Sequence, residues 1–154
     1  MAESATEQLN IREMIVDDVP QVFEIERLSF KHSSWTIDAF YHEITQNQYA
    51  KYFVAERNGQ IIGYLGLWTV LDQAQVTTVA VSEIYRNLGL GQLLLKYGMT
   101  YAAHTCDTMS LEVRVDNIIA QHVYEKLGFQ YGGKRKNYYG DGEDALVMWV
   151  KLHE

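Results

Sequence analysis

A loop with two closely spaced glycines is the first place in this sequence where residue types and spacing could do chemistry. Gly89 and Gly91 lie between an apolar, strand-like run that ends at Val81 and an apolar helical pattern that begins near Leu93. The first amides of a helix lack partners within the helix, and the helix dipole adds positive potential, so a pyrophosphate can dock there if no side chains block it. A simple tight turn explains the same two glycines, so both interpretations stay open.

This loop does not match two other phosphate-binding patterns. A P-loop requires a lysine followed by serine or threonine after its last glycine, and no such pair follows Gly91. A dinucleotide-binding fold expects a third glycine and a ribose-binding acid after an early strand, whereas this loop lies in the middle of the chain. The first class is therefore excluded and the second is disfavoured.

A second segment, from Leu111 to Phe129, carries a carboxylate and a phenol that could move protons. Glu112 lies on the polar side of an alternating strand pattern, where a solvated carboxylate paired with Arg114 is the ordinary expectation. Tyr124 lies on the apolar stripe of the following helical pattern, where it could donate a proton or pack in the core. For Tyr124, periodicity alone does not decide between these roles.

Hydrophobic periodicity and turn residues predict the elements that must position these groups. Asn58 followed by Gly59 predicts a hairpin turn, Thr36 and either Asp116 or Asn117 are expected to cap helices, and Gly128 to end one. The expected strands cover 10–15, 52–56, 61–70, 73–81, 109–115, 129–133 and 145–151, and the expected helices about 19–29, 36–46, 93–105 and 118–127. This order predicts an α/β domain with a mixed sheet and helices on its faces.

The composition excludes several classes of protein. The chain has 154 residues, of which 47% are hydrophobic and 21% charged, with a single proline, which is typical of one globular domain and excludes disordered and low-complexity classes. The formal net charge of -7 disfavours direct binding to nucleic acid. The single cysteine, Cys106, cannot form an intrachain disulfide, and the histidines lack metal-ligand spacing, so no metal is expected.

The amino terminus and the hydropathy pattern bear on location. The first residues are polar and acidic and lack the pattern of a signal peptide, and no apolar run reaches the roughly 18 residues of a membrane span. We therefore expect a soluble, cytoplasmic protein without a membrane partner, with residues 1–9 as a flexible lead.

The two segments together resemble the GCN5-related N-acetyltransferase (GNAT) family. The run from Arg86 to Gly91 matches that family's acetyl-CoA loop, Arg/Gln-x-x-Gly-x-Gly/Ala. The second segment matches the family's strand-Asn-helix-Tyr-x-x-x-Gly-Phe arrangement through Asn117, Tyr124, Gly128 and Phe129. The resemblance covers about 11–151. It implies one N-acetyltransferase domain over 1–154, a mostly antiparallel central sheet of about seven strands with helices on both faces, and acetyl-CoA as cosubstrate.

The resemblance also implies a role for each candidate site residue. Glu112 would accept the proton of the substrate amine, directly or through water, and Tyr124 would donate to the departing CoA sulfur. Trp35, Tyr138 and Tyr139 would contact a peptide substrate, with Asn137 beside the tyrosine pair. Lys134, Arg135 and Lys136 are expected to form a solvated basic cluster, with contact to the 3′-phosphate of CoA or to an acidic partner as the alternative. The cofactor-binding residues would be Val79, Ala80, Val81, Arg86, Asn87, Leu88, Gly89, Leu90, Gly91, Gln92 and Asn117.

Within the family, the sequence is most similar to the RimI type, which acetylates the amino terminus of a ribosomal protein. The similarity rests on VLDQA (70–74), LEVR (111–114) and NYY (137–139) followed by EDALVM (143–148), although Ser34 stands where relatives usually have proline. It implies direct transfer, in a ternary complex, to the N-terminal alanine of small-subunit ribosomal protein S18. Acetylation of a small amine or a lysine, and a non-catalytic module that responds to acyl-CoA, remain alternatives, and the oligomeric state stays open.

Overall fold

The computed structural model describes residues 9–30, 35–86, 88–136, 138–139 and 143–153. Most of the predicted flexible lead, as well as Asn87 and Asn137, therefore lies outside the described residues. The described strands are β1 (Leu9–Glu13), β2 (Ala50–Arg57), β3 (Gln60–Val70), β4 (Gln73–Val81), β5 (Thr108–Arg114), β6 (Gln130–Arg135) and β7 (Ala145–Lys151). The described helices are α1 (Val19–Ser29), α2 (Ile37–Thr45), α3 (Leu90–Ala102) and α4 (Ile118–Lys126), with short 3-10 turns η1 (Val16–Asp18) and η2 (Glu83–Tyr85).

The strands form one mixed sheet in the order β1-β2-β3-β4-β5-β7-β6. Neighbouring strands are antiparallel except β4 and β5, which run parallel. The prediction of a mixed, mostly antiparallel sheet in an α/β fold is confirmed. In the described part of the chain, no helix is long and apolar enough to cross a membrane.

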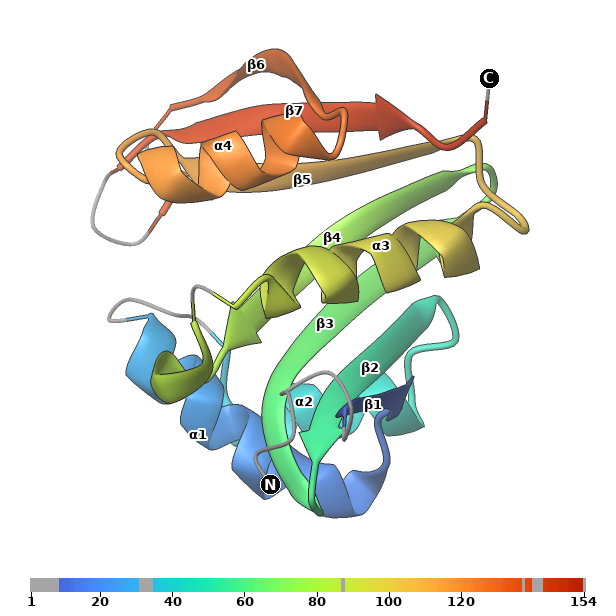
Figure 1. Cartoon of the computed structure of the whole chain (residues 1–154). Helices are drawn as coiled ribbons and strands as arrows, with labels where there is room; N and C mark the ends of the chain where they lie inside the picture. Colours follow the sequence, from blue (N-terminus) through green and yellow to red (C-terminus); the bar gives the residue numbers. More distant parts are fainter. Residues whose placement is uncertain (1–8, 31–34, 87, 137, 140–142, 154) are drawn as a thin grey trace.

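The parallel pair β4 and β5 is joined only at its start. Gln73 to Gln75 pair with Thr108 to Ser110, and the two strands then diverge toward their carboxyl ends (Figure 1). Each strand keeps its other neighbour, since β4 stays paired with β3 as far as Val81 and β5 stays paired with β7 as far as Arg114. The last residues of β4 therefore present their backbone to the opening without pairing to any described residue of β5.

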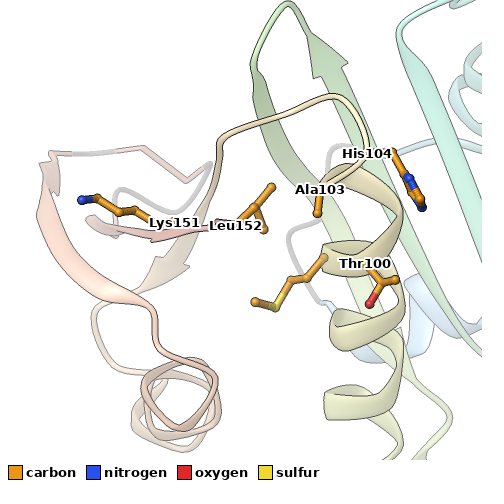
Figure 2. A pocket seen from close by; sticks show the side chains of 6 residues that line it. Thr100, Ala103, His104, Lys151 and Leu152 are labelled. Atoms are coloured by element: carbon orange, nitrogen blue, oxygen red, sulfur yellow. The ribbon is translucent and has the colours of Figure 1, made fainter. Parts of the chain in front are cut away.

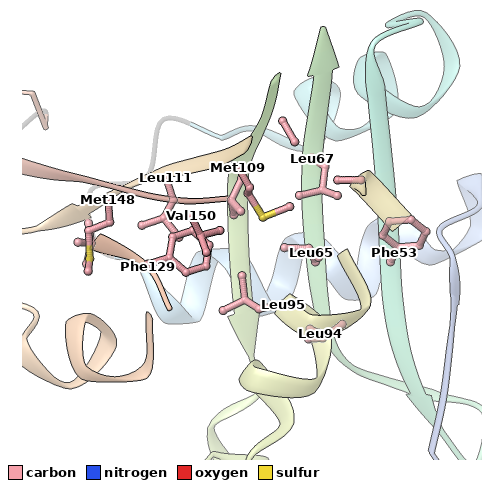
Figure 3. Packing of buried hydrophobic residues seen from close by; sticks show 14 of the residues in the cluster. Phe53, Leu65, Leu67, Leu94, Leu95, Met109, Leu111, Phe129, Met148 and Val150 are labelled. Atoms are coloured by element: carbon pink, nitrogen blue, oxygen red, sulfur yellow. The ribbon is translucent and has the colours of Figure 1, made fainter. Parts of the chain in front are cut away.

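Two hydrophobic cores cover the two faces of the sheet. One core lies under α3 and α4 and combines residues of β2, β3, β5 and β7, so it holds both halves of the diverging sheet together (Figure 3). The other lies under α1 and α2, where Phe40 and Val22 pack on Tyr52 and Tyr64. Helices therefore lie on both faces, as predicted.

The local turn and cap predictions are also confirmed. Asn58 and Gly59 both have positive φ, 53° and 80°, as a type I′ hairpin turn requires. The Thr36 hydroxyl accepts a hydrogen bond from Ala39 N at 3.1 Å, and Asn117 Oδ1 accepts one from Ala120 N at 3.1 Å. These interactions depend on residues a few positions apart, which is why the sequence predicts them well.

The predicted end of β6 is wrong. The strand continues to Arg135 instead of ending at Gly133, so Lys134 and Arg135 belong to the sheet and not to a polar connection. A register shift between Tyr131 and Gly133 leaves Gly132 without a pairing partner on β7. Such a bulge bends the strand without ending it. Because the bulge changes which side chains face each side of the sheet, Arg135 points toward β5.

A second bulge, in β4, also controls the side-chain directions. The register with β3 shifts between Gly66 and Leu67, and Thr77 is the extra residue. As a result Thr77 and Thr78 both face α1 and α2. Thr77 Oγ1 lies 2.9 Å from the Tyr52 hydroxyl, and Thr78 donates to the buried carboxylate of Glu26 at 2.8 Å.

Candidate active site

The amino terminus of α3 lies just beyond the end of β4, separated from it by η2 (Figure 1). Gly89 is the N-cap residue, with φ 78° and ψ 8°, and the first intrahelical bond runs from Leu93 N to Gly89 O at 3.1 Å. The amides of Gly89, Leu90, Gly91 and Gln92 therefore have no acceptor within the helix. Four donors and the positive end of the helix dipole are gathered beside the opening between β4 and β5.

The two glycines of this loop differ in backbone conformation and in the space around them. Gly89 has a left-handed backbone conformation, so turn geometry accounts for it. Gly91 has no positive φ, and an added Cβ would meet no described atom closer than Val81 Cγ2 at 3.9 Å. A side chain at Gly91 would fit this structure, so a tight turn does not explain that residue. Its absence leaves the helix amides open to a ligand.

The Arg86 side chain fixes this loop to the rest of the protein. Its Nε donates to Val81 O at 3.0 Å, and its Nη2 donates to Ser29 Oγ at 3.0 Å. Arg86 thereby ties the loop to the end of β4 and to the end of α1. Of its neighbours, Leu88 is exposed and Leu90 is buried in the core under α3.

The Glu112 carboxylate accepts hydrogen bonds from two side chains, Arg135 and Gln75. Neither is Arg114, the partner considered in the sequence analysis. Glu112 Oε1 accepts a hydrogen bond from Arg135 Nη1 at 3.0 Å, and its Oε2 accepts one from Gln75 Nε2 at 3.2 Å. The Glu112 side chain is 14% exposed. The expectation that Glu112 is a solvated carboxylate is therefore wrong, because its side chain is mostly buried and accepts hydrogen bonds from Gln75 and Arg135. Arg135 of the basic cluster stays half exposed and also forms an ion pair with Glu112.

Tyr138 and Tyr139 pack beside Glu112 on two arginines. The Arg135 guanidinium lies 4.5 Å from the Tyr138 ring centre, and the Arg114 guanidinium lies 4.2 Å from that of Tyr139. The two rings meet edge to face at 5.0 Å. Burial, with smaller effects from neighbouring charges, raises the pKa of Tyr139 to about 12. The structure thus brings the tyrosine pair to Glu112, and its contact with a peptide stays a prediction.

Tyr124 lies on α4, packed on the core, with its ring centre 5.9 Å from that of Phe129. Burial raises its pKa to about 12, so the phenol keeps its proton throughout the physiological range. Both Tyr124 and Glu112 act electrostatically on Tyr139. A carboxylate on β5 and a proton-bearing phenol on α4 therefore lie near the same tyrosine.

The remaining predicted residues have identifiable structural contacts. Trp35 stacks on Phe40 at 5.0 Å and meets the edge of Tyr52 at 6.1 Å, which places it in the aromatic cluster under α2. Asn117 uses Oδ1 to cap α4, so its Nδ2 is the group left for a cofactor. Val79 and Val81 pack toward the core under α3, and Ala80 is buried in the other core.

A separate hollow lies at the opposite end of α3. It has a volume of about 480 Å³ and is lined by Met99, Thr100, Ala103, His104, Lys151 and Leu152 (Figure 2). None of the predicted site residues lines it. The candidate active site is instead defined by the helix amides and Glu112 beside the opening between β4 and β5, together with Tyr124 on α4.

Comparison with known proteins identifies the family. Residues 19–129 match the Acetyltransferase (GNAT) family. The chain belongs to this family. Acetyltransferases of this family use acetyl-CoA.

Individual relatives match almost the whole chain. A Bacillus subtilis protein that carries the provisional name ribosomal protein bS18-alanine N-acetyltransferase is 47% identical over 146 residues, covering 94% of this chain and 96% of the relative. An N-alpha-acetyltransferase of Sulfurisphaera tokodaii is 33% identical and covers 94% of both chains. The crystal structure of the ribosomal-protein-S18-alanine N-acetyltransferase from Escherichia coli has a TM-score of 0.83 and 29% identity and covers 95% of both chains.

Proposed function

We propose that this acetyltransferase transfers the acetyl group of acetyl-CoA to the N-terminal α-amine of a protein, with the N-terminal alanine of ribosomal protein S18 as its substrate. The observation that carries the proposal is the position of Glu112, which stands at the opening between β4 and β5 with its carboxylate oriented by two donors. The substrate follows from the Bacillus subtilis relative, which is 47% identical over nearly the full length of both chains.

The chain offers a suitable set of groups for acetyl-CoA. The amides from Gly89 to Gln92 would bind the pyrophosphate, and the unpaired edge of β4 at Val79 to Val81 would pair with the amide-containing pantetheine arm. Asn117 Nδ2 is a further donor near the start of α4. When bound, the cosubstrate supplies a thioester carbonyl that an amine can attack.

Glu112 would accept a proton from the amine. An α-amine has a pKa near ~8, so about a tenth of it is already neutral at pH 7, whereas fewer than about one in a thousand lysine amines are neutral there. A carboxylate suffices as base for the first case. Each carboxylate oxygen has two acceptor positions, so Glu112 can accept from the amine while Gln75 and Arg135 keep their bonds.

Tyr124 would donate a hydrogen bond to the leaving sulfur. A phenol with a pKa of about 12 is a much weaker acid than a thiol near ~8.5, so complete proton transfer from Tyr124 runs uphill. A hydrogen bond needs no such transfer and strengthens as the sulfur gains negative charge. Tyr124 therefore acts as a hydrogen-bond donor, and solvent supplies the proton that completes the thiol.

The substrate class is tested by acetylation of three peptides with acetyl-CoA, followed by mass spectrometry. One peptide has a free N-terminal alanine, the second is the same peptide with a blocked terminus, and the third is blocked but contains a lysine. We expect rapid acetylation of the first peptide alone. Faster acetylation of the lysine peptide would point to a lysine acetyltransferase, and no turnover with peptides or small amines would point to a non-catalytic module.

The acetyl-CoA loop is tested at Gly91. We expect Gly91→Val to lower the affinity for acetyl-CoA at least tenfold, about 1.4 kcal/mol, because the new side chain would fill the space before the helix amides. Valine is no worse than glycine in a helix, and the nearest described atom to its Cβ is 3.9 Å away, so the fold should persist.

The matched control for Gly91→Val is Thr100→Val, which introduces the same side chain at an exposed position of α3. Calorimetric titration measures affinity, and circular dichroism checks the fold. Equal affinities for Gly91→Val and the control would rule out pyrophosphate binding at these amides.

A further inference from the structure

Gln75 lies at the point in β4 where the pairing with β5 ends. It is the last β4 residue paired with β5, opposite Ser110, and the strands diverge directly after it. Glu112 lies two residues beyond Ser110 on β5 and therefore faces the same side of the sheet. The Gln75 amide reaches forward to it, with 3.2 Å between Nε2 and Glu112 Oε2. This hydrogen bond connects the two strands at the point where they separate.

The sheet directs Gln75 toward β5. On its other side, Gln75 pairs with Trp68 of β3, whose side chain faces the same surface and donates from Nε1 to Glu43 Oε1 at 2.6 Å. Glu43 is buried and also accepts a hydrogen bond from the Tyr52 hydroxyl, so the indole is held in place. The fixed Trp68 indole occupies the space on one side of Gln75. The glutamine amide therefore points to the other side, toward Glu112.

Gln75 and Arg135 hold Glu112 in physically different ways. The Arg135 side chain is 54% exposed, and exposed ion pairs are weakened by solvent and by side-chain freedom. Gln75 is partly buried within the sheet and carries no charge. A neutral donor orients a carboxylate and favours its charged form less than a second cation would, so it weakens the base less.

We propose that Gln75 is a positioning residue for acetyl transfer, whose amide holds the Glu112 carboxylate toward the opening between β4 and β5 so that an unused acceptor position meets the incoming amine. This role rests on the proposed function of Glu112 as base. It acts by removing rotational freedom from the Glu112 side chain, because a base contributes fully only when it is already aligned with the proton that it accepts.

A double-mutant cycle tests whether Gln75 acts through Glu112. We expect Gln75→Leu to lower kcat about tenfold, with the KM for acetyl-CoA unchanged, because the side chain keeps its bulk but loses its donor. In a Glu112→Ala background the same substitution should cause no further loss. The matched control is Gln73→Leu, at an exposed position two residues earlier on the same strand, which should keep full activity.

A charge substitution gives a second readout that a merely structural residue would not change. Gln75→Glu keeps the side-chain shape but places another carboxylate beside Glu112. The charged and titratable side chains nearby include Arg114, Arg135, Tyr138 and Tyr139. Since a like charge disfavours ionisation, the acidic limb of the kcat profile should move to higher pH in this variant.

The outcomes separate this proposal from the function on which it rests. Multiplicative losses in the cycle, full activity of Gln75→Leu, or an unmoved acidic limb in Gln75→Glu would each overturn the role of Gln75 and leave Glu112 as the base. Full activity of Glu112→Ala would instead contradict the proposed base, and the role of Gln75 with it. Thermal unfolding of each variant checks that lost activity does not reflect lost fold.

Discussion

Glu112→Gln is expected to slow acetylation of an alanine-ended peptide by about 10²-fold or more near neutral pH, because the amide cannot accept the amine proton. Most of an α-amine is still protonated at pH 7, so the reaction there depends on a base to remove the proton. The fold should survive, because glutamine has nearly the same shape and Glu112 lies at a partly open position.

The loss in Glu112→Gln should shrink as pH rises through about 8, since more of the α-amine then arrives neutral. A lysine substrate would keep its dependence on Glu112 well past about pH 9, because its amine loses the proton near ~10.4. The measurement is the ratio of variant to wild-type rates from about pH 6.5 to about 9.5, on the alanine-ended peptide. The pH profile therefore reports both the base and the class of amine.

Glu112→Gln also changes the hydrogen bonds of the side chain, and this effect needs a control. The native carboxylate accepts from Arg135 and from Gln75, whereas glutamine offers only one oxygen, so one of these donors loses its acceptor. That effect does not vary with the ionisation of the substrate amine. A rate ratio independent of pH would therefore argue for a structural Glu112. Glu125→Gln, an exposed carboxylate on α4, is the matched control and should keep wild-type rates.

Much of the fold could be predicted because it depends on local patterns. The turn at Asn58 and Gly59, the caps at Thr36 and Asn117 and the alternation in β5 each involve residues close together in sequence. Their physical causes are equally local, namely allowed backbone angles, cap hydrogen bonds and the two-residue period of a strand.

The partners of Glu112 could not be predicted in this way. Gln75 and Arg135 reach it from β4 and β6, and which side chains meet depends on the registers between strands. A one-residue slip turns every side chain to the other face, and the bulges at Thr77 and Gly132 are such local slips. Nothing in the composition of these strands marks a bulge clearly, although the glycine at 132 is a weak signal.

The helix stripe containing Tyr124 was ambiguous for a different reason. Periodicity indicates that a residue faces inward, but packing and hydrogen-bond donation both need an inward position. The structure adds the burial that raises the pKa of the phenol to about 12, and the shared neighbourhood with Glu112 and Tyr139. Both roles can therefore hold for one side chain, because the ring packs on the core and the hydroxyl can be removed without changing that packing.

Tyr124→Phe makes that separation, and we expect it to lower kcat by about 10- to 10²-fold while leaving the KM for acetyl-CoA nearly unchanged. The hydroxyl contributes most when the sulfur carries developing charge, so its loss affects the transition state more than binding. Phenylalanine keeps the contact with Phe129, so the melting temperature should not fall. Tyr131→Phe, at a tyrosine that is 63% exposed on β6, is the matched control. A packing role predicts normal turnover in Tyr124→Phe, and wild-type kcat with unchanged stability would remove Tyr124 from the reaction while leaving Glu112 and the helix amides in place.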